Sequence, residues 1–118
     1  MIGASAALYR REARSRRRRF LLLPLALALL LCQCQLRNAH TMIGQTRDEV
    51  YRMEGVELDE ASRYHVAIAK GLLAVAEKQY EDADFAAAAK FATRAHEQVE
   101  RALQLQKLHE AAGKSSQQ

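Results

Sequence analysis

The side chains able to carry out chemistry are few in this chain, and they form no recognised reactive pattern. The hydroxyls of Ser62 and Thr93 have no His and Asp partners at a recognisable spacing. The sequence has neither a Gly-rich phosphate loop nor a G-x-S-x-G elbow. Its histidines lack the H-x-x-x-H and H-E-x-x-H spacings of zinc sites; they are His40, His65, His96 and His109. We therefore expect a protein that is not an enzyme, with no metal site, no cofactor and no small-molecule substrate.

Cys32 and Cys34 are the only cysteines, and a single residue separates them. A disulfide between such close neighbours would be strained. A C-x-C pair that binds a metal needs further ligands, and the nearest His is His40. Both cysteines instead stand at the end of the apolar run FLLLPLALALLLC, residues 20–32, which directly follows the basic segment RREARSRRRR, residues 10–19. A cationic segment followed by such a run is typical of a secretory signal.

The apolar run is also a candidate membrane span. As a helix, residues 20–32 measure about 20 Å, whereas the hydrocarbon core of a bilayer is about 30 Å thick. An extension to Leu36 lengthens the span but adds Gln33 and Gln35. The positive-inside rule would keep the arginines in the cytoplasm and place the rest of the chain outside it. We predict that residues 1–34 form a signal peptide or a membrane anchor.

A signal that ends at cysteine resembles a bacterial lipoprotein signal, in which the cysteine becomes the lipidated first residue after cleavage. Leu29 and Leu31 suit the family's position three residues before each Cys. The residues directly before the cysteines, Leu31 and Gln33, depart from the family's small residue. The resemblance implies lipid attachment at Cys32 or Cys34. Because neither cysteine is followed by Asp, it favours the periplasmic face of the outer membrane, with the inner membrane as the alternative.

Two further interpretations of this segment stay open. The sequence RRRFL at residues 17–21 matches the core of a twin-arginine export signal. The sequence ALA at residues 26–28 is an alternative small-x-small cleavage site. Cleavage there would leave the second half of the apolar run on the product.

Charge is distributed unevenly along the chain. Residues 1–35 contain seven Arg and one Glu, whereas residues 36–118 contain 11 bases and 13 acids. The net charge of +4 is therefore due to the first third of the sequence alone. A nucleic-acid-binding domain needs a basic face that neutralises phosphates. We expect no nucleic-acid partner for the body of the protein.

The body is predicted to be all-α, because it is rich in helix-forming residues and poor in the Gly and Pro of β-turns. Thr46 and Glu49 have the spacing of a capping box, so a first helix is expected to start near Thr46, or earlier near Asn38. Asp59 suits an N-cap, and Gly113 suits a helix end. The predicted domain covers residues 35–112, with helices at about 44–54, 59–81 and 84–111 and a disordered tail at 113–118.

The last two predicted helices carry apolar residues at 3-4 spacing, and a short acidic segment joins them. This arrangement predicts an antiparallel helical hairpin with a short preceding helix that covers one side. The first of the two helices has a heptad-like stripe formed by Val66, Ala69, Leu73, Ala76 and Tyr80. A second stripe beside it contains Ile68, Leu72 and Val75. We predict that this second stripe is a surface for self-association or for a protein partner.

Residues 58–103 contain an Ala-rich helix, a turn of the form small residue–Asp–aromatic, and then Ala at every third or fourth position. The turn is Ala83-Asp84-Phe85, and the repeat is Ala88, Ala92 and Ala95. This pattern resembles a family of short bacterial envelope lipoproteins, some of which are joined to an OmpA-like domain. It is also similar to half of a tetratricopeptide repeat. The resemblance implies a helical structural or interaction module in the cell envelope. The alternative is a single-span accessory subunit of a larger inner-membrane complex.

Overall fold

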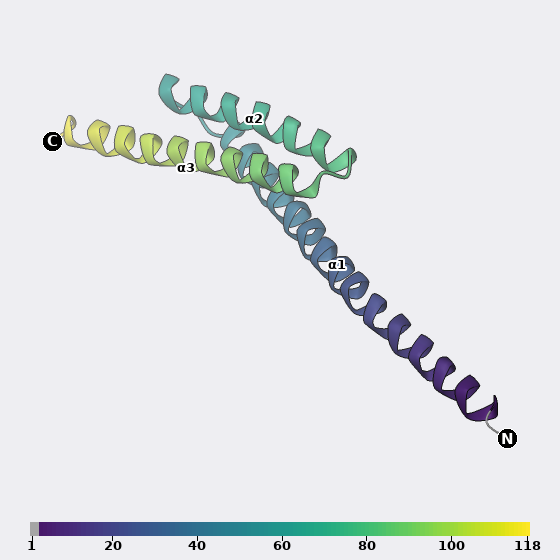
Figure 1. Cartoon of the computed structure of the whole chain (residues 1–118). Helices are drawn as coiled ribbons and strands as arrows, with labels where there is room; N and C mark the ends of the chain where they lie inside the picture. Colours follow the sequence, from purple (N-terminus) through teal and green to yellow (C-terminus); the bar gives the residue numbers. More distant parts are fainter. Residues whose placement is uncertain (1–2) are drawn as a thin grey trace. The chain divides into compact units, whose positions relative to one another are not determined.

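The computed structural model describes the backbone of residues 3–118 and the side chains of residues 16–118. It contains three helices: α1 over Gly3–Glu54, α2 over Glu60–Glu81 and α3 over Phe85–Ser115 (Figure 1). No strand occurs in the described residues, and the prediction of an all-α fold is confirmed. The chain divides into two compact units, Met1–Cys34 and Gln35–Gln118, and α1 contributes residues to both.

Helix α1 begins at Gly3 rather than near Thr46 or Asn38, so the predicted helix at 44–54 is the last part of a longer one. Thr46 is fully buried within the last part of α1. Its hydroxyl lies 3.5 Å from the backbone carbonyl oxygen of Ala92 and donates a hydrogen bond to it. The side chain therefore makes a contact between helices instead of a cap. The residues between Pro24 and Thr46 include no further proline, and α1 accommodates both Pro24 and Gly44.

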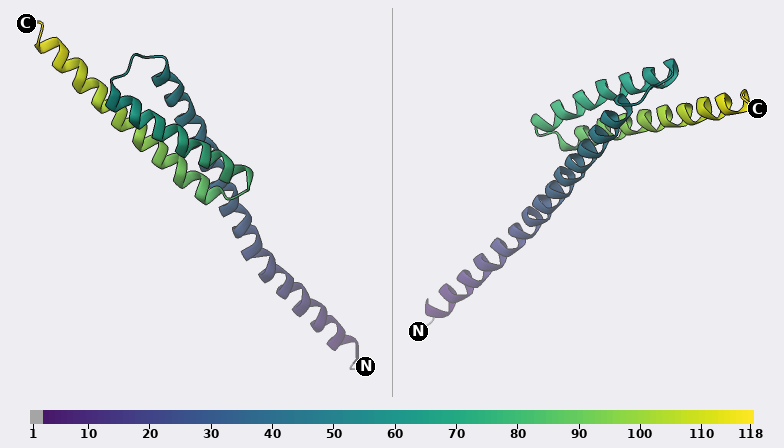
Figure 2. Two further views of the ribbon diagram at one scale, coloured as in Figure 1. Left: turned by 90° about the horizontal axis from the view of Figure 1, so that it is seen from above. Right: turned by 180° about the vertical axis from the view of Figure 1, so that it is seen from behind.

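Helices α2 and α3 lie side by side and run antiparallel (Figures 1 and 2). The Asp59 carboxylate caps α2 by accepting a hydrogen bond from the backbone nitrogen of Ser62 at 3.4 Å. A hydrogen bond from the Ser62 side chain lowers the pKa of Asp59 from its ordinary value of 3.8. Asp84 caps α3 in the same way, through the backbone nitrogen of Ala87 at 3.0 Å. Both aspartates stand where the sequence predicts these helices to begin.

The turn between α2 and α3 is closed by backbone hydrogen bonds. The Ala83 amide donates to the carbonyl of Tyr80 at 3.0 Å, and the Asp84 amide donates to the carbonyl of Gln79 at 2.9 Å. This is the Schellman pattern, which needs a left-handed residue just after the helix. Ala83 fills that position with φ of 61°. Glycine usually occupies it, because a Cβ atom disfavours the left-handed region.

Two clusters of buried side chains hold residues 35–118 together, and each combines residues from α1, α2 and α3. The cluster nearer the α2–α3 turn consists of Ala39, Ile43, Leu73, Ala76, Ala88, Ala92 and Ala95. The other consists of Val50, Met53, Leu58, Val66, Ala69, Val99 and Ala102. Alanine side chains are short, so the helices approach closely. The last part of α1 thus completes a three-helix bundle with the hairpin.

Helix α3 is also longer than predicted. It continues through Gly113 to Ser115, so the first part of the predicted disordered tail is helical. The hydroxyls of Ser115 and Ser116 donate hydrogen bonds to the carbonyl of Ala112 at 2.9 and 2.8 Å. The same carbonyl also accepts a hydrogen bond from the backbone amide of Ser116 at 3.3 Å. The helix therefore ends at Ser115, two residues after the glycine, where backbone and serine side-chain hydrogen bonds meet at one carbonyl.

Candidate membrane anchor and interaction surface

The apolar run of α1 is long and apolar enough, with its flanking residues, to cross a membrane or to act as a signal sequence. Every large apolar side chain between Phe20 and Leu31 is more than half exposed. A helix that is apolar on all sides is stable where a membrane surrounds it. Pro24 lies inside the helix, as membrane-spanning helices tolerate. This segment is therefore a candidate membrane anchor.

Cys32 and Cys34 both lie within α1, and both are free and exposed. Residues two apart on a helix are separated by about 200° around its axis. The two thiols therefore point away from each other, and a disulfide within one chain does not fit this backbone. Exposure leaves either sulfur accessible to a modifying enzyme.

Polar contacts attach the last part of α1 to the hairpin. Arg47 forms an ion pair with Glu77, and Glu54 forms one with Lys70, so both contacts reach α2. On α3, the Nδ1 atom of His96 lies 2.7 Å from a carboxylate oxygen of Glu49. The sequence pattern did not reveal these pairs, because their members are far apart along the chain.

The predicted interaction stripe lies on the other side of α2. Because a helix turns by about 100° per residue, Ile68 and Leu72 lie nearly opposite Lys70 and Glu77, the residues that bind α1. Ile68 and Leu72 are half-buried, and Val75 is 39% exposed. Helix α1 therefore leaves this side of α2 uncovered.

Phe91 of α3 belongs to the same uncovered side, a position that helical spacing alone does not reveal. His65 precedes Leu72 by seven residues and Gln98 follows Phe91 by seven, so each pair shares one helix face. The Nδ1 atom of His65 lies 2.7 Å from the Oε1 atom of Gln98, which brings the two faces together. Leu72 and Phe91 also pack against the same buried cluster. We call Ile68, Leu72, Val75 and Phe91 the open face.

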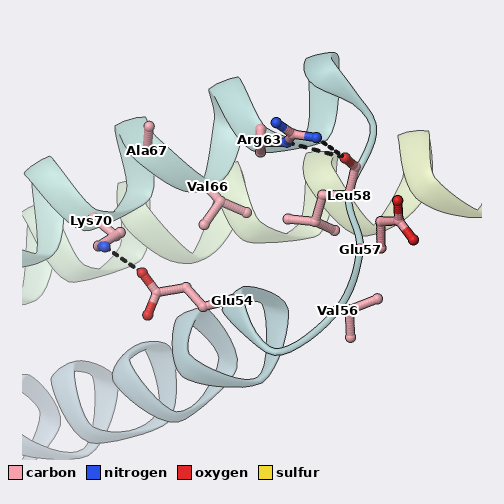
Figure 3. A pocket seen from close by; sticks show the side chains of 8 residues that line it. All are labelled: Glu54, Val56, Glu57, Leu58, Arg63, Val66, Ala67 and Lys70. Atoms are coloured by element: carbon pink, nitrogen blue, oxygen red, sulfur yellow. Dashed lines mark hydrogen bonds and ion pairs between the residues drawn. The ribbon is translucent and has the colours of Figure 1, made fainter.

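A surface pocket of about 490 Å³ lies where α1 ends and α2 begins (Figure 3). Its charged side chains mostly point to partners within the chain. Arg63 donates to the carbonyl oxygen of Leu58 through Nε at 3.2 Å and Nη2 at 2.9 Å. Lys70 contacts the Glu54 carboxylate. These contacts fix the connecting loop to α2. The pocket is lined by Glu54, Val56, Glu57, Leu58, Arg63, Val66, Ala67 and Lys70.

The hydroxyl groups of Ser62 and Thr93 make hydrogen bonds within the bundle and do not meet at a common site. Ser62 is buried, where its hydroxyl contacts the Asp59 carboxylate and lies 3.1 Å from the carbonyl oxygen of Ala102. Thr93 bonds the carbonyl of Ala89 in its own helix at 2.9 Å. Among the side chains of residues 16–118, no cluster of His, Cys, Asp and Glu has the makings of a metal site.

The chain matches no protein-family model, no curated protein and no solved structure.

Proposed function

We propose that this protein is a membrane-anchored component of a bacterial cell envelope whose helical bundle is a structural or protein-interaction module. The observation that supports it best is the combination of an exposed apolar helix with the open face, where apolar side chains of α2 and α3 lie together on the side away from α1. A contiguous apolar patch left uncovered on a small domain is typical of an interaction site. No reaction is part of this proposal.

Lipidation at Cys32 or Cys34 is the proposed mode of anchoring, at the periplasmic face of the outer membrane. The position of both cysteines at the end of the apolar run supports it. An uncleaved span is the alternative, and the protein would then be an accessory subunit of a larger inner-membrane complex. The exposed apolar helix suits both modes.

Replacement of both cysteines by alanine tests the anchor. We expect the variant to lose its lipid mass and to be released into the periplasm or to remain as an unprocessed precursor. Intact mass spectrometry of the membrane fraction from the native host measures cleavage, lipid mass and the identity of the first residue. An unchanged mass and unchanged fractionation of the double variant would exclude lipidation and leave the uncleaved span.

Charge on the open face tests the interaction module. Leu72→Glu and Val75→Glu should leave the helix content intact, because Val75 is exposed, Leu72 is only half-buried and α1 packs on the other side of α2. Self-association or capture of a partner should be lost. Circular dichroism and light scattering of the full chain in detergent measure the two properties. Ala74→Glu, on the side of α2 near α1, is the matched control. Equal association of all three variants and the unmodified chain would contradict the proposed surface.

A further inference from the structure

Unpaired positive charge is concentrated just before the apolar run. The chain has no Asp or Glu within four residues of Arg17, Arg18 or Arg19 on either side. The backbone there is helical, and all four side chains of Arg16–Arg19 are exposed. Like charges three and four residues apart on a helix repel each other. An external anion would therefore stabilise this helical segment.

The position of these arginines fits the headgroup layer of a membrane. Arg19 is followed directly by Phe20, the first residue of the apolar run, within one continuous helix. At about 1.5 Å per residue, four residues occupy about 6 Å of helix. The polar layer on each side of a bilayer is about 5–8 Å thick. The arginines at 10, 11 and 14 lie farther out but within about 15 Å of the first apolar residue.

The arrangement of the charges around the helix favours a membrane over a nucleic acid. At about 100° per residue, four consecutive arginines are distributed over all sides of the helix. A duplex would contact one side only, whereas lipid headgroups surround a helix that enters the bilayer. The guanidinium group also donates two parallel hydrogen bonds to phosphate oxygens, which makes arginine a strong ligand for this group.

We propose that residues 10–19 bind the phosphates of anionic phospholipids in the leaflet where α1 enters the membrane. This inference rests on the alternative mode of anchoring, in which the span stays uncleaved and residues 10–19 remain on the protein, and it adds the class of lipid. Each arginine near the surface strengthens binding to an anionic leaflet by about fivefold. The segment would thus select anionic lipids as neighbours of the anchor.

The test uses the full chain reconstituted in vesicles of phosphatidylcholine with a minor share of phosphatidylglycerol. Native mass spectrometry of the protein released from these vesicles measures the ratio of bound phosphatidylglycerol to bound phosphatidylcholine. We expect enrichment of phosphatidylglycerol, and a loss of about tenfold or more when Arg17, Arg18 and Arg19 are all replaced by Gln. The triple Lys variant keeps the charge but not the paired hydrogen bonds, and it should retain part of the enrichment. A salt concentration of about 1 M should weaken the enrichment of phosphatidylglycerol, because charges are then screened beyond about 3 Å.

Several results would overturn the inference. They are equal binding of both lipids, an unchanged ratio in the Gln variant, and displacement of phosphatidylglycerol by inorganic phosphate or by duplex DNA. Recovery of the protein from its host without residues 10–19 would also overturn it. Extraction of the chain from vesicles by alkaline carbonate would refute the proposed membrane-spanning anchor itself. Stable insertion without lipid preference would refute only the lipid inference.

Discussion

Replacement of Ala76 by glutamate is expected to unfold the helical bundle. Ala76 has no exposed surface and lies in the cluster that α1, α2 and α3 share near the turn. A carboxylate there would be buried without a partner, which costs about 3 kcal/mol or more. The longer side chain would also force apart helices that approach closely. A domain is stabilised by about 5–15 kcal/mol in total, and an Ala-rich one lies at the low end of this range.

Ala74→Glu is the matched control for Ala76→Glu, because it makes the same change two residues away at an exposed position. We expect the control to change the free energy of unfolding by no more than about 0.5 kcal/mol. Helix content and thermal unfolding, both followed by circular dichroism, give the comparison. Equal melting of the two variants would show that α2 does not pack against the other helices.

Charged substitutions in the apolar run of α1 are expected to detach the protein from the membrane. The double variant Leu25→Asp, Leu27→Asp places two carboxylates in the middle of the apolar run. Each Asp at the centre of a membrane helix opposes insertion by about 3 kcal/mol. Together they should shift the protein from the membrane fraction to the soluble or aggregated fraction. Sedimentation of membranes after an alkaline carbonate wash measures this shift.

Leu108→Asp is the control for the anchor variants. Leu108 is also exposed, at 67%, but it belongs to α3 and not to the apolar run. This variant should stay in the membrane fraction. Retention of the Leu25→Asp, Leu27→Asp protein in washed membranes would mean that another part of the chain attaches it.

Local signals account for the parts of the fold that could be predicted from the sequence. Asp59 and Asp84 mark the starts of α2 and α3, because a cap acts on the residues directly after it. The stripe through Leu73 and Ala76 is buried as predicted, since helical periodicity is also local. Thr46 shows where local spacing fails to predict the start of a helix. Its capping spacing is genuine, but the hydroxyl bonds α3 from within a longer helix.

Local signals in the sequence also predict part of the candidate site. The anchor is visible in composition alone, and the stripe of Leu72 and Val75 follows from periodicity. Phe91 was missed because its place on the open face depends on how α3 is rotated against α2. The ion pairs that position α1 join residues such as Arg47 and Glu77, which no spacing rule connects.

The alanine content of the core also determines how stability depends on temperature. Among the described side chains, seven of the fourteen buried apolar residues are alanines. The heat capacity of unfolding rises with the apolar area that becomes exposed, and an alanine exposes only one methyl group. The heat capacity of unfolding per residue should therefore fall below the usual value of about 12–15 cal/mol/K. A small heat-capacity change flattens the stability curve, so the bundle keeps its modest stability over a wide range of temperature and is far from cold denaturation.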